Sequence, residues 1–100
     1  MIVADIRAIP IGSGTSQSEH IKAVYDMLDE EKIRYIPGPM STAVEVDSLD
    51  DLFDIIELLN QLLADRGVQR ILTSVNIDYR LDKEISMESK LKAAKMKKSS

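Results

Sequence analysis

The spacing of the hydrophobic residues changes along the first eighty positions between a strand pattern and a helix pattern. Alternation of period two occurs four times, and two stripes with helical spacing separate the first strand from the second and the third from the last. This order restricts the chain to a few topologies. The predicted elements are strands at 2–9, 33–36, 41–46 and 69–80, and helices from Ser16 to the polar run at 29–32, from Ser48 to Gly67 and from Ser86 onward.

Two split β-α-β units in this order are typical of the ferredoxin-like arrangement. The predicted fold class is therefore α+β, a βαββαβ sandwich. Its four-stranded antiparallel sheet carries two helices on one face, and a C-terminal helix follows. One hundred residues suffice for one domain. We expect a single domain over 1–100, with its core in 1–82 and the C-terminal helix and basic tail in 83–100.

Local signals predict where the helices begin and end. Ser16 with Glu19, and Ser48 with Asp51, each fit a capping box, in which side chains satisfy the free N–H groups of a helix start. Gly67 suits the left-handed residue that ends a helix.

Apolar stripes predict which helix faces are buried. His20, in the first helical turn, is expected to be exposed, and Pro10 is expected to stop the first strand because proline lacks an N–H group. The stripe of the last helix is thin, which predicts weak docking or a partner chain. The three stripes are Ile21, Val24, Tyr25 and Leu28; Leu49, Leu52, Phe53, Ile56, Leu59, Leu62 and Leu63; and Met87, Leu91 and Ala94.

Composition excludes several classes of function. Residues 83–100 carry six lysines and two glutamates, a net charge of +4, and the whole chain carries −4, which leaves −8 on residues 1–82. A nucleic-acid partner is not expected, since such proteins usually present a basic face. With no cysteine and one histidine, we expect no metal site and no catalytic residues. No membrane partner is expected, and the expected location is cytoplasmic, because neither a membrane span nor a signal peptide is recognisable.

One face of the predicted sheet is left without helices and collects polar side chains. Such a mixture suits a subunit interface, a small polar ligand or both, and a solvated face with paired charges remains an alternative. Asp5, Glu45 and Asp78 are the acids of this face, and they are candidates to hold a cation or an aminopyrimidine edge. Alternation places here Asp5, Arg7, Tyr35, Glu45, Ser74, Asn76 and Asp78, with Val3, Ile9 and Leu72 among them, and it turns Ile2, Ala4, Ile6 and Ala8 of the first strand toward the helices.

The segment 37–39, Pro-Gly-Pro, must turn, and three candidate residues border it. Tyr35 is suited to stacking on a flat heterocycle or to packing at the sheet edge, and we expect it on the uncovered face. Met40 and Thr42 follow the turn, where Met40 either packs or lines a pocket. The loop 12–16 is suited to a plain helix cap or to holding an anion.

Two segments, 35–46 and 67–80, carry motifs that occur together in a known family. The chain resembles the UPF0045 family of small thiamine-binding proteins, relatives of the YkoF hydroxymethylpyrimidine/thiamine-binding proteins. The resemblance covers nearly the whole chain and departs at Asn76, where the family pattern has a lysine. The matching residues are Tyr35, Pro39, Met40, Thr42 and Glu45 in the first segment and Gly67, Arg70, Thr73, Ile77, Asp78 and Arg80 in the second.

The resemblance implies a homo-oligomer, a dimer or a tetramer built as a dimer of dimers, that binds thiamine or its hydroxymethylpyrimidine moiety near a subunit interface without catalysing a reaction. In this reading Glu45 accepts from the exocyclic amine, Tyr35 stacks on the ring or lines the wall of the site, and Thr42 and Asn76 bond ring nitrogens. The alternative is an oligomeric regulatory or interaction module that binds another small effector or an anion. The expected ligand-binding residues are Tyr35, Met40, Thr42, Glu45, Asn76, Asp78 and Asp5.

Overall fold

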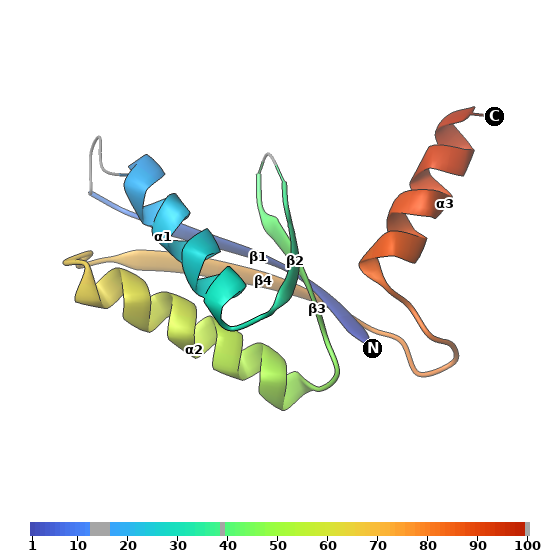
Figure 1. Ribbon diagram of the computed structural model, residues 1–100, viewed down its shortest axis with the longest axis horizontal. Coiled ribbons are helices and arrows are strands. Elements are labelled where there is room, and N and C mark those ends of the chain that lie inside the picture. Colours follow the sequence, from blue (N-terminus) through green and yellow to red (C-terminus); the bar gives the residue numbers. More distant parts are fainter. Residues whose placement is uncertain (13–16, 39, 100) are drawn as a thin grey trace.

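Four strands form one antiparallel sheet, and two helices cover one of its faces (Figure 1). The computed structural model describes residues 1–12, 17–38 and 40–99. The strand order is β2-β3-β1-β4, and all three pairings are antiparallel, which confirms the predicted α+β class and βαββαβ order. The elements are β1 (Ile2–Pro10), α1 (Gln17–Glu30), β2 (Arg34–Pro37), β3 (Thr42–Val46), α2 (Leu49–Asp65), β4 (Ile71–Tyr79) and α3 (Met87–Ser99).

The core lies between the sheet and the helices α1 and α2. Alternate residues of β1 point into it, as period-two patterning requires: Ile2, Ala4 and Ile6 are all buried. Leu28 of α1 and Leu52 of α2 pack against them and are almost fully buried. The predicted inward set of β1 is therefore confirmed.

The two ends of α2 follow the signals in the sequence. The Ser48 hydroxyl accepts a hydrogen bond of 3.1 Å from the Asp51 N–H, which satisfies one of the free donors at the helix start. Gly67 follows the helix with a φ of 90°, a left-handed conformation that costs glycine little. The predicted cap at Ser48 and the predicted helix end at Gly67 are confirmed.

The buried stripe of α2 is rotated relative to the predicted one. Phe53, expected in the core, is 53% exposed, whereas Ile55, which was not in the predicted stripe, is buried. Buried residues spaced by three or four positions share one helix face, and Phe53 lies about 100° around the helix from Leu52. The prediction for Phe53 was wrong, and the buried residues are Leu52, Ile55, Leu59 and Leu63.

β1 continues to Pro10, which pairs with Ile71 of β4, so the expectation that Pro10 stops the strand was wrong. Proline is compatible with extended backbone at the end of a strand. The ladder continues one residue further, since the Ile11 N–H donates to the Arg70 carbonyl at 2.9 Å. The capping box predicted at Ser16 lies outside the described residues.

His20 connects the two helices of the covered face. It is only 7% exposed, and its Nδ1 accepts a hydrogen bond of 2.9 Å from Nε of Arg66, the residue that follows α2. The predicted exposure of His20 was therefore wrong. The partner is 46 positions away in the sequence, and no local pattern indicates such a pair.

The opposite, outer face of the sheet is covered at one end by the segment that leads into α3. Ile85 and Met87 bury Val3, with Ile36 and Ala43 packed around them. Beyond this contact α3 projects away from the sheet (Figure 1). The outer face is thus covered at one end only.

Candidate functional site

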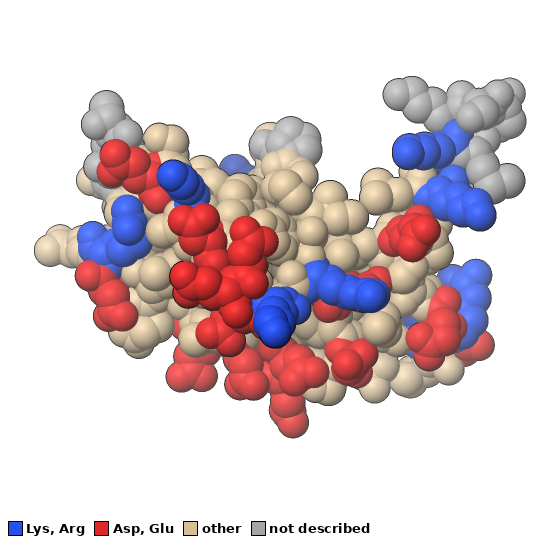
Figure 2. Space-filling model, viewed as in Figure 1, with Lys and Arg blue, Asp and Glu red and all other residues tan. Residues whose placement is uncertain are grey.

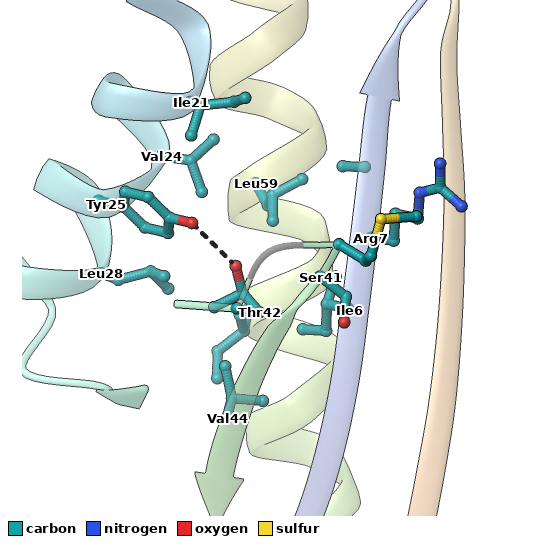
Figure 3. A pocket seen from close by; sticks show the side chains of 14 residues that line it. Ile6, Arg7, Ile21, Val24, Tyr25, Leu28, Ser41, Thr42, Val44 and Leu59 are labelled. Carbon is teal, nitrogen blue, oxygen red and sulfur yellow. Dashed lines mark hydrogen bonds between the residues drawn. The ribbon is translucent and has the colours of Figure 1, made fainter. Parts of the chain in front are cut away.

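A cavity of about 150 Å³ lies on the covered side of the sheet, between α1, α2, β1 and the β2–β3 turn (Figure 3). Its lining is mainly aliphatic, with Val24 and Leu28 from α1 and Leu59 from α2. Met40 and Ile21 also line it, and both side chains are exposed to solvent, so they mark its opening. The cavity is a partly enclosed apolar space of the kind that small ligands occupy.

Hydroxyl groups stand at one side of this cavity. The Thr42 hydroxyl points toward the Tyr25 hydroxyl and donates a long hydrogen bond of 3.4 Å to it (Figure 3). Ser41 also lines the cavity, and its hydroxyl donates to the carboxylate of Asp5. The site therefore combines an apolar interior with a few polar groups that could orient a ligand.

The β2–β3 turn that presents these residues is tightly built. The Gly38 N–H donates to the Ser41 carbonyl at 2.8 Å, and a Cβ atom at position 38 would lie 2.7 Å from that oxygen. Only glycine fits this approach without a shift of the backbone. The turn therefore holds Met40 and Thr42 at the cavity, where the sequence placed two candidate ligand residues.

Tyr35 lies on the covered face of the sheet, whereas the sequence predicted the uncovered one. Directly paired residues of an antiparallel ladder point to the same side, and Tyr35 pairs with the buried Val44. Its ring stacks on Tyr25 with 5.6 Å between centroids and 8° between planes. Its hydroxyl donates to Asp29 at 2.9 Å, and this hydrogen bond, with a smaller effect of burial, raises the pKa of Tyr35.

Glu45 is buried on the outer face, away from the cavity. Its carboxylate accepts 2.9 Å hydrogen bonds from Nη1 of Arg34 and from the backbone N–H of Met87, the first residue of α3. Burial by itself raises the pKa of Glu45, but the two donors outweigh it and hold the pKa below its ordinary value. The carboxylate thus serves as an anchor for the start of α3.

The remaining predicted residues also lie on the outer face. Asp5 pairs with Asn76, and Val3 pairs with Asp78, in the β1–β4 ladder. The carboxylate of Asp78 forms an ion pair with Lys90 of α3. The seven predicted residues are therefore divided between two faces, with Met40 and Thr42 at the cavity, Tyr35 behind its wall, and Asp5, Glu45, Asn76 and Asp78 opposite.

Two lining residues with hydroxyl groups, Tyr25 and Ser41, were not among the predicted site residues. Tyr25 was assigned to the apolar stripe of the first helix, and a phenol among aliphatic stripe positions is the signal that would have singled it out. Within the described ranges, no group of three or more His, Cys, Asp or Glu side chains is placed to hold a metal ion. Nor does any helix in these ranges combine the length and apolar character needed to cross a membrane.

Residues 4–95 match the model of a protein family described as thiamine-binding protein. The chain belongs to this family. It is 37% identical over 98 residues to the UPF0045 protein YqgV of Bacillus subtilis, with 93% of each chain covered. It is 30% identical over 98 residues to a UPF0045 protein of Methanothermobacter thermautotrophicus, with 97% and 99% covered. The predicted resemblance to the UPF0045 family of thiamine-binding proteins is thereby confirmed.

Solved structures share the fold. A hypothetical protein of Methanocaldococcus jannaschii, 33% identical, superposes with a TM-score of 0.80 over 94% of this chain and 95% of its own. A Thermotoga maritima protein named for a suggested role in thiamine biosynthesis or salvage superposes with a TM-score of 0.79, with 93% and 97% covered. At 22% identity, this second likeness concerns the fold.

Proposed function

We propose that this protein binds thiamine, or the aminopyrimidine moiety of thiamine, in the cavity between α1 and the β2–β3 turn, and that it catalyses no reaction. The observation that carries the proposal is this cavity of about 150 Å³, lined by apolar side chains and hydroxyl groups, in a member of a thiamine-binding family. Family membership supports thiamine as the class of ligand, and the cavity supports the position of the binding site.

The size of the cavity supports a ligand with one buried ring. An apolar cavity of roughly 150 Å³ accommodates a benzene-sized molecule, and thiamine contains two rings. The pyrimidine therefore fits inside, and the cationic thiazolium extends past the rim that Met40 and Ile21 form.

The polar groups and the surface charge support a cationic ligand with a polar ring. The hydroxyl groups of Thr42 and Tyr25 are within the lining, where they can bond ring nitrogens or the exocyclic amine. Acidic side chains gather over the end of α1 and the start of α2 (Figure 2). α2 contains no lysine or arginine, and such a surface attracts a cation.

Calorimetry with thiamine and with hydroxymethylpyrimidine tests the proposal. Thr42→Val keeps the shape of the side chain and removes its hydroxyl, so affinity for both molecules should fall by about tenfold, the equivalent of one good hydrogen bond. Thr73→Val is the matched control, because Thr73 donates to Asn60 and does not line the cavity. A wild-type protein that binds neither molecule would overturn the proposal.

A second candidate site is supported by the outer face. Asp5, Asn76 and Asp78 share this face with Leu72, about half of which is exposed. This arrangement favours the alternative function, a regulatory module whose effector binds there. Asn76→Ala in the same calorimetric assay distinguishes the two sites. If Asn76→Ala loses thiamine binding and Thr42→Val keeps its affinity for thiamine, the binding site lies on the outer face.

We also propose that the outer face pairs with a second copy of the chain. Leu72 on β4 and Leu91 on α3 are both about half exposed, and a second sheet would remove Leu72 from water. Leu72→Asp should then shift the protein toward monomer in sedimentation velocity. Leu81→Asp, at a more exposed leucine outside the strands, should leave the assembly unchanged. Equal sedimentation of wild type and Leu72→Asp would contradict this pairing.

A further inference from the structure

The tyrosine that the sequence singled out does not line the cavity, but the tyrosine stacked on it does. Tyr25 is a lining residue, whereas Tyr35 contacts the ring of Tyr25. We infer that Tyr35 is a positioning residue: by stacking on Tyr25 it fixes that ring as a wall of the cavity and so restricts the cavity to a single flat ring. This inference rests on the proposed function, because the cavity is the proposed binding site.

The ring of Tyr25 is held from two strands. Tyr35, on β2, covers one face of it in a nearly parallel stack at 5.6 Å, and the Thr42 hydroxyl, on β3, donates to its phenolic oxygen. With one face occupied, only the opposite face and the edges of the ring remain for a ligand. The position of this wall is thus determined by β2 and β3 rather than by α1 alone.

Asp29 holds Tyr35 in turn. Asp29 follows Tyr25 by four positions on α1, so the two side chains lie on the same helix face, one turn apart. The ring of Tyr35 stacks on the ring of Tyr25, and its hydroxyl donates a hydrogen bond of 2.9 Å to the carboxylate of Asp29. Tyr35 therefore lies along α1 with both its ring and its hydroxyl engaged, and the exposed bond to Asp29 adds little to the stack.

The stack and the Asp29 bond are separable by mutation. Tyr35→Phe keeps the ring and removes the hydroxyl, whereas Tyr35→Leu keeps apolar volume and removes the flat ring. Because the wall depends on the stack, Tyr35→Leu should lower affinity for hydroxymethylpyrimidine by about tenfold. Tyr35→Phe should change it by no more than about threefold, since the Asp29 bond is exposed. Tyr79→Leu is the matched control, at a half-exposed tyrosine on β4 outside the cavity.

The selectivity between small and bulky ring ligands would not change if Tyr35 only stabilised the fold. If Tyr25 is released, the cavity can widen, and the ratio of affinities between hydroxymethylpyrimidine and a bulkier ring such as quinazoline should fall in Tyr35→Leu. Equal loss for both ligands, or no loss for either, would overturn the positioning role even if the wild type binds.

The failure of the proposed function would have a different signature. If the wild type binds neither probe, the proposed function is wrong. The ring motion of Tyr25 then tests separately whether Tyr35 holds the ring of Tyr25 in place. Nuclear magnetic resonance of the ring protons should show slower rotation of Tyr25 in the wild type and in Tyr35→Phe than in Tyr35→Leu. The same rotation rate in all three proteins would show that Tyr35 does not hold the wall.

Discussion

Replacing Glu45 by alanine is expected to release the start of α3 from the sheet and to lower the free energy of unfolding. The side chain of Glu45 is only 4% exposed, and its carboxylate joins Arg34 on β2 to the first N–H group of α3. The Lys90–Asp78 ion pair, the contacts of Ile85 and Met87 with Val3, and the ion pair of the N-terminal ammonium with Glu84 also hold this segment.

The expected magnitude follows from what each partner loses. Arg34 has a side chain that is 72% exposed, so it returns to water at little cost. The Met87 N–H is in a buried hydrogen bond, and leaving such a donor unsatisfied costs about 1–3 kcal/mol. The lost apolar contacts of the side chain add about 1 kcal/mol. We therefore expect Glu45→Ala to destabilise the protein by about 2–4 kcal/mol.

Urea unfolding measures this loss, and amide hydrogen exchange locates it. Exchange should accelerate more in residues 88–95 of α3 than in β1. Asp82→Ala is the matched control, because it also removes an arginine–carboxylate pair, with Arg80, but an exposed one that should matter little. If α3 exchanges equally fast in wild type and Glu45→Ala, the anchoring role of the carboxylate is refuted.

The pH dependence of the same contact has a definite sign. The pKa of Glu45 is lower in the folded protein than its ordinary value, so its carboxylate stabilises the fold fully above the ordinary value. This contribution is lost as pH falls through the lowered pKa. Wild type should therefore exceed Glu45→Gln in stability at neutral pH, and the difference should shrink under acidic conditions. A difference independent of pH would contradict the assignment.

Two further substitutions test the fold and the turn. Leu52→Ala removes a fully buried side chain and should cost about 2–5 kcal/mol in urea unfolding, whereas Phe53→Ala, at a position 53% exposed, should cost less. Equal losses would contradict the burial pattern of α2. Gly38→Ala places a Cβ atom 2.7 Å from the Ser41 carbonyl, so it should destabilise the turn by about 1–3 kcal/mol and weaken thiamine binding. Unchanged stability and affinity in this variant would show that the turn adapts freely.

Local patterns were sufficient to predict the order of the elements and much of the core. The alternation in β1 predicted that Ile2, Ala4 and Ile6 are buried, and the cap of α2 at Ser48 and its end at Gly67 are where the sequence indicated. These features depend on residues within a few positions of each other, where the chain geometry fixes which side chains share a face.

The candidate site was predicted only in part, because its geometry depends on contacts between distant segments. Met40 and Thr42 lie at the cavity as neighbours of the turn, which a local signal marked. β2 has only four residues, too few for its own pattern to show which side faces the helices, and the pairing of Tyr35 with Val44 decides it.

The sequence by itself determined the alternation of strands and helices, their caps and the excess of acid over base outside the C-terminal segment, since these are properties of neighbouring residues and of composition. The tertiary structure decided that His20 meets Arg66, that Glu45 holds the start of α3 and that Tyr25 and Tyr35 stack beside a cavity. Each of these pairs joins residues ten or more positions apart. Such pairs form only when elements pack, because packing and hydrogen bonding between elements select which of the available faces meet.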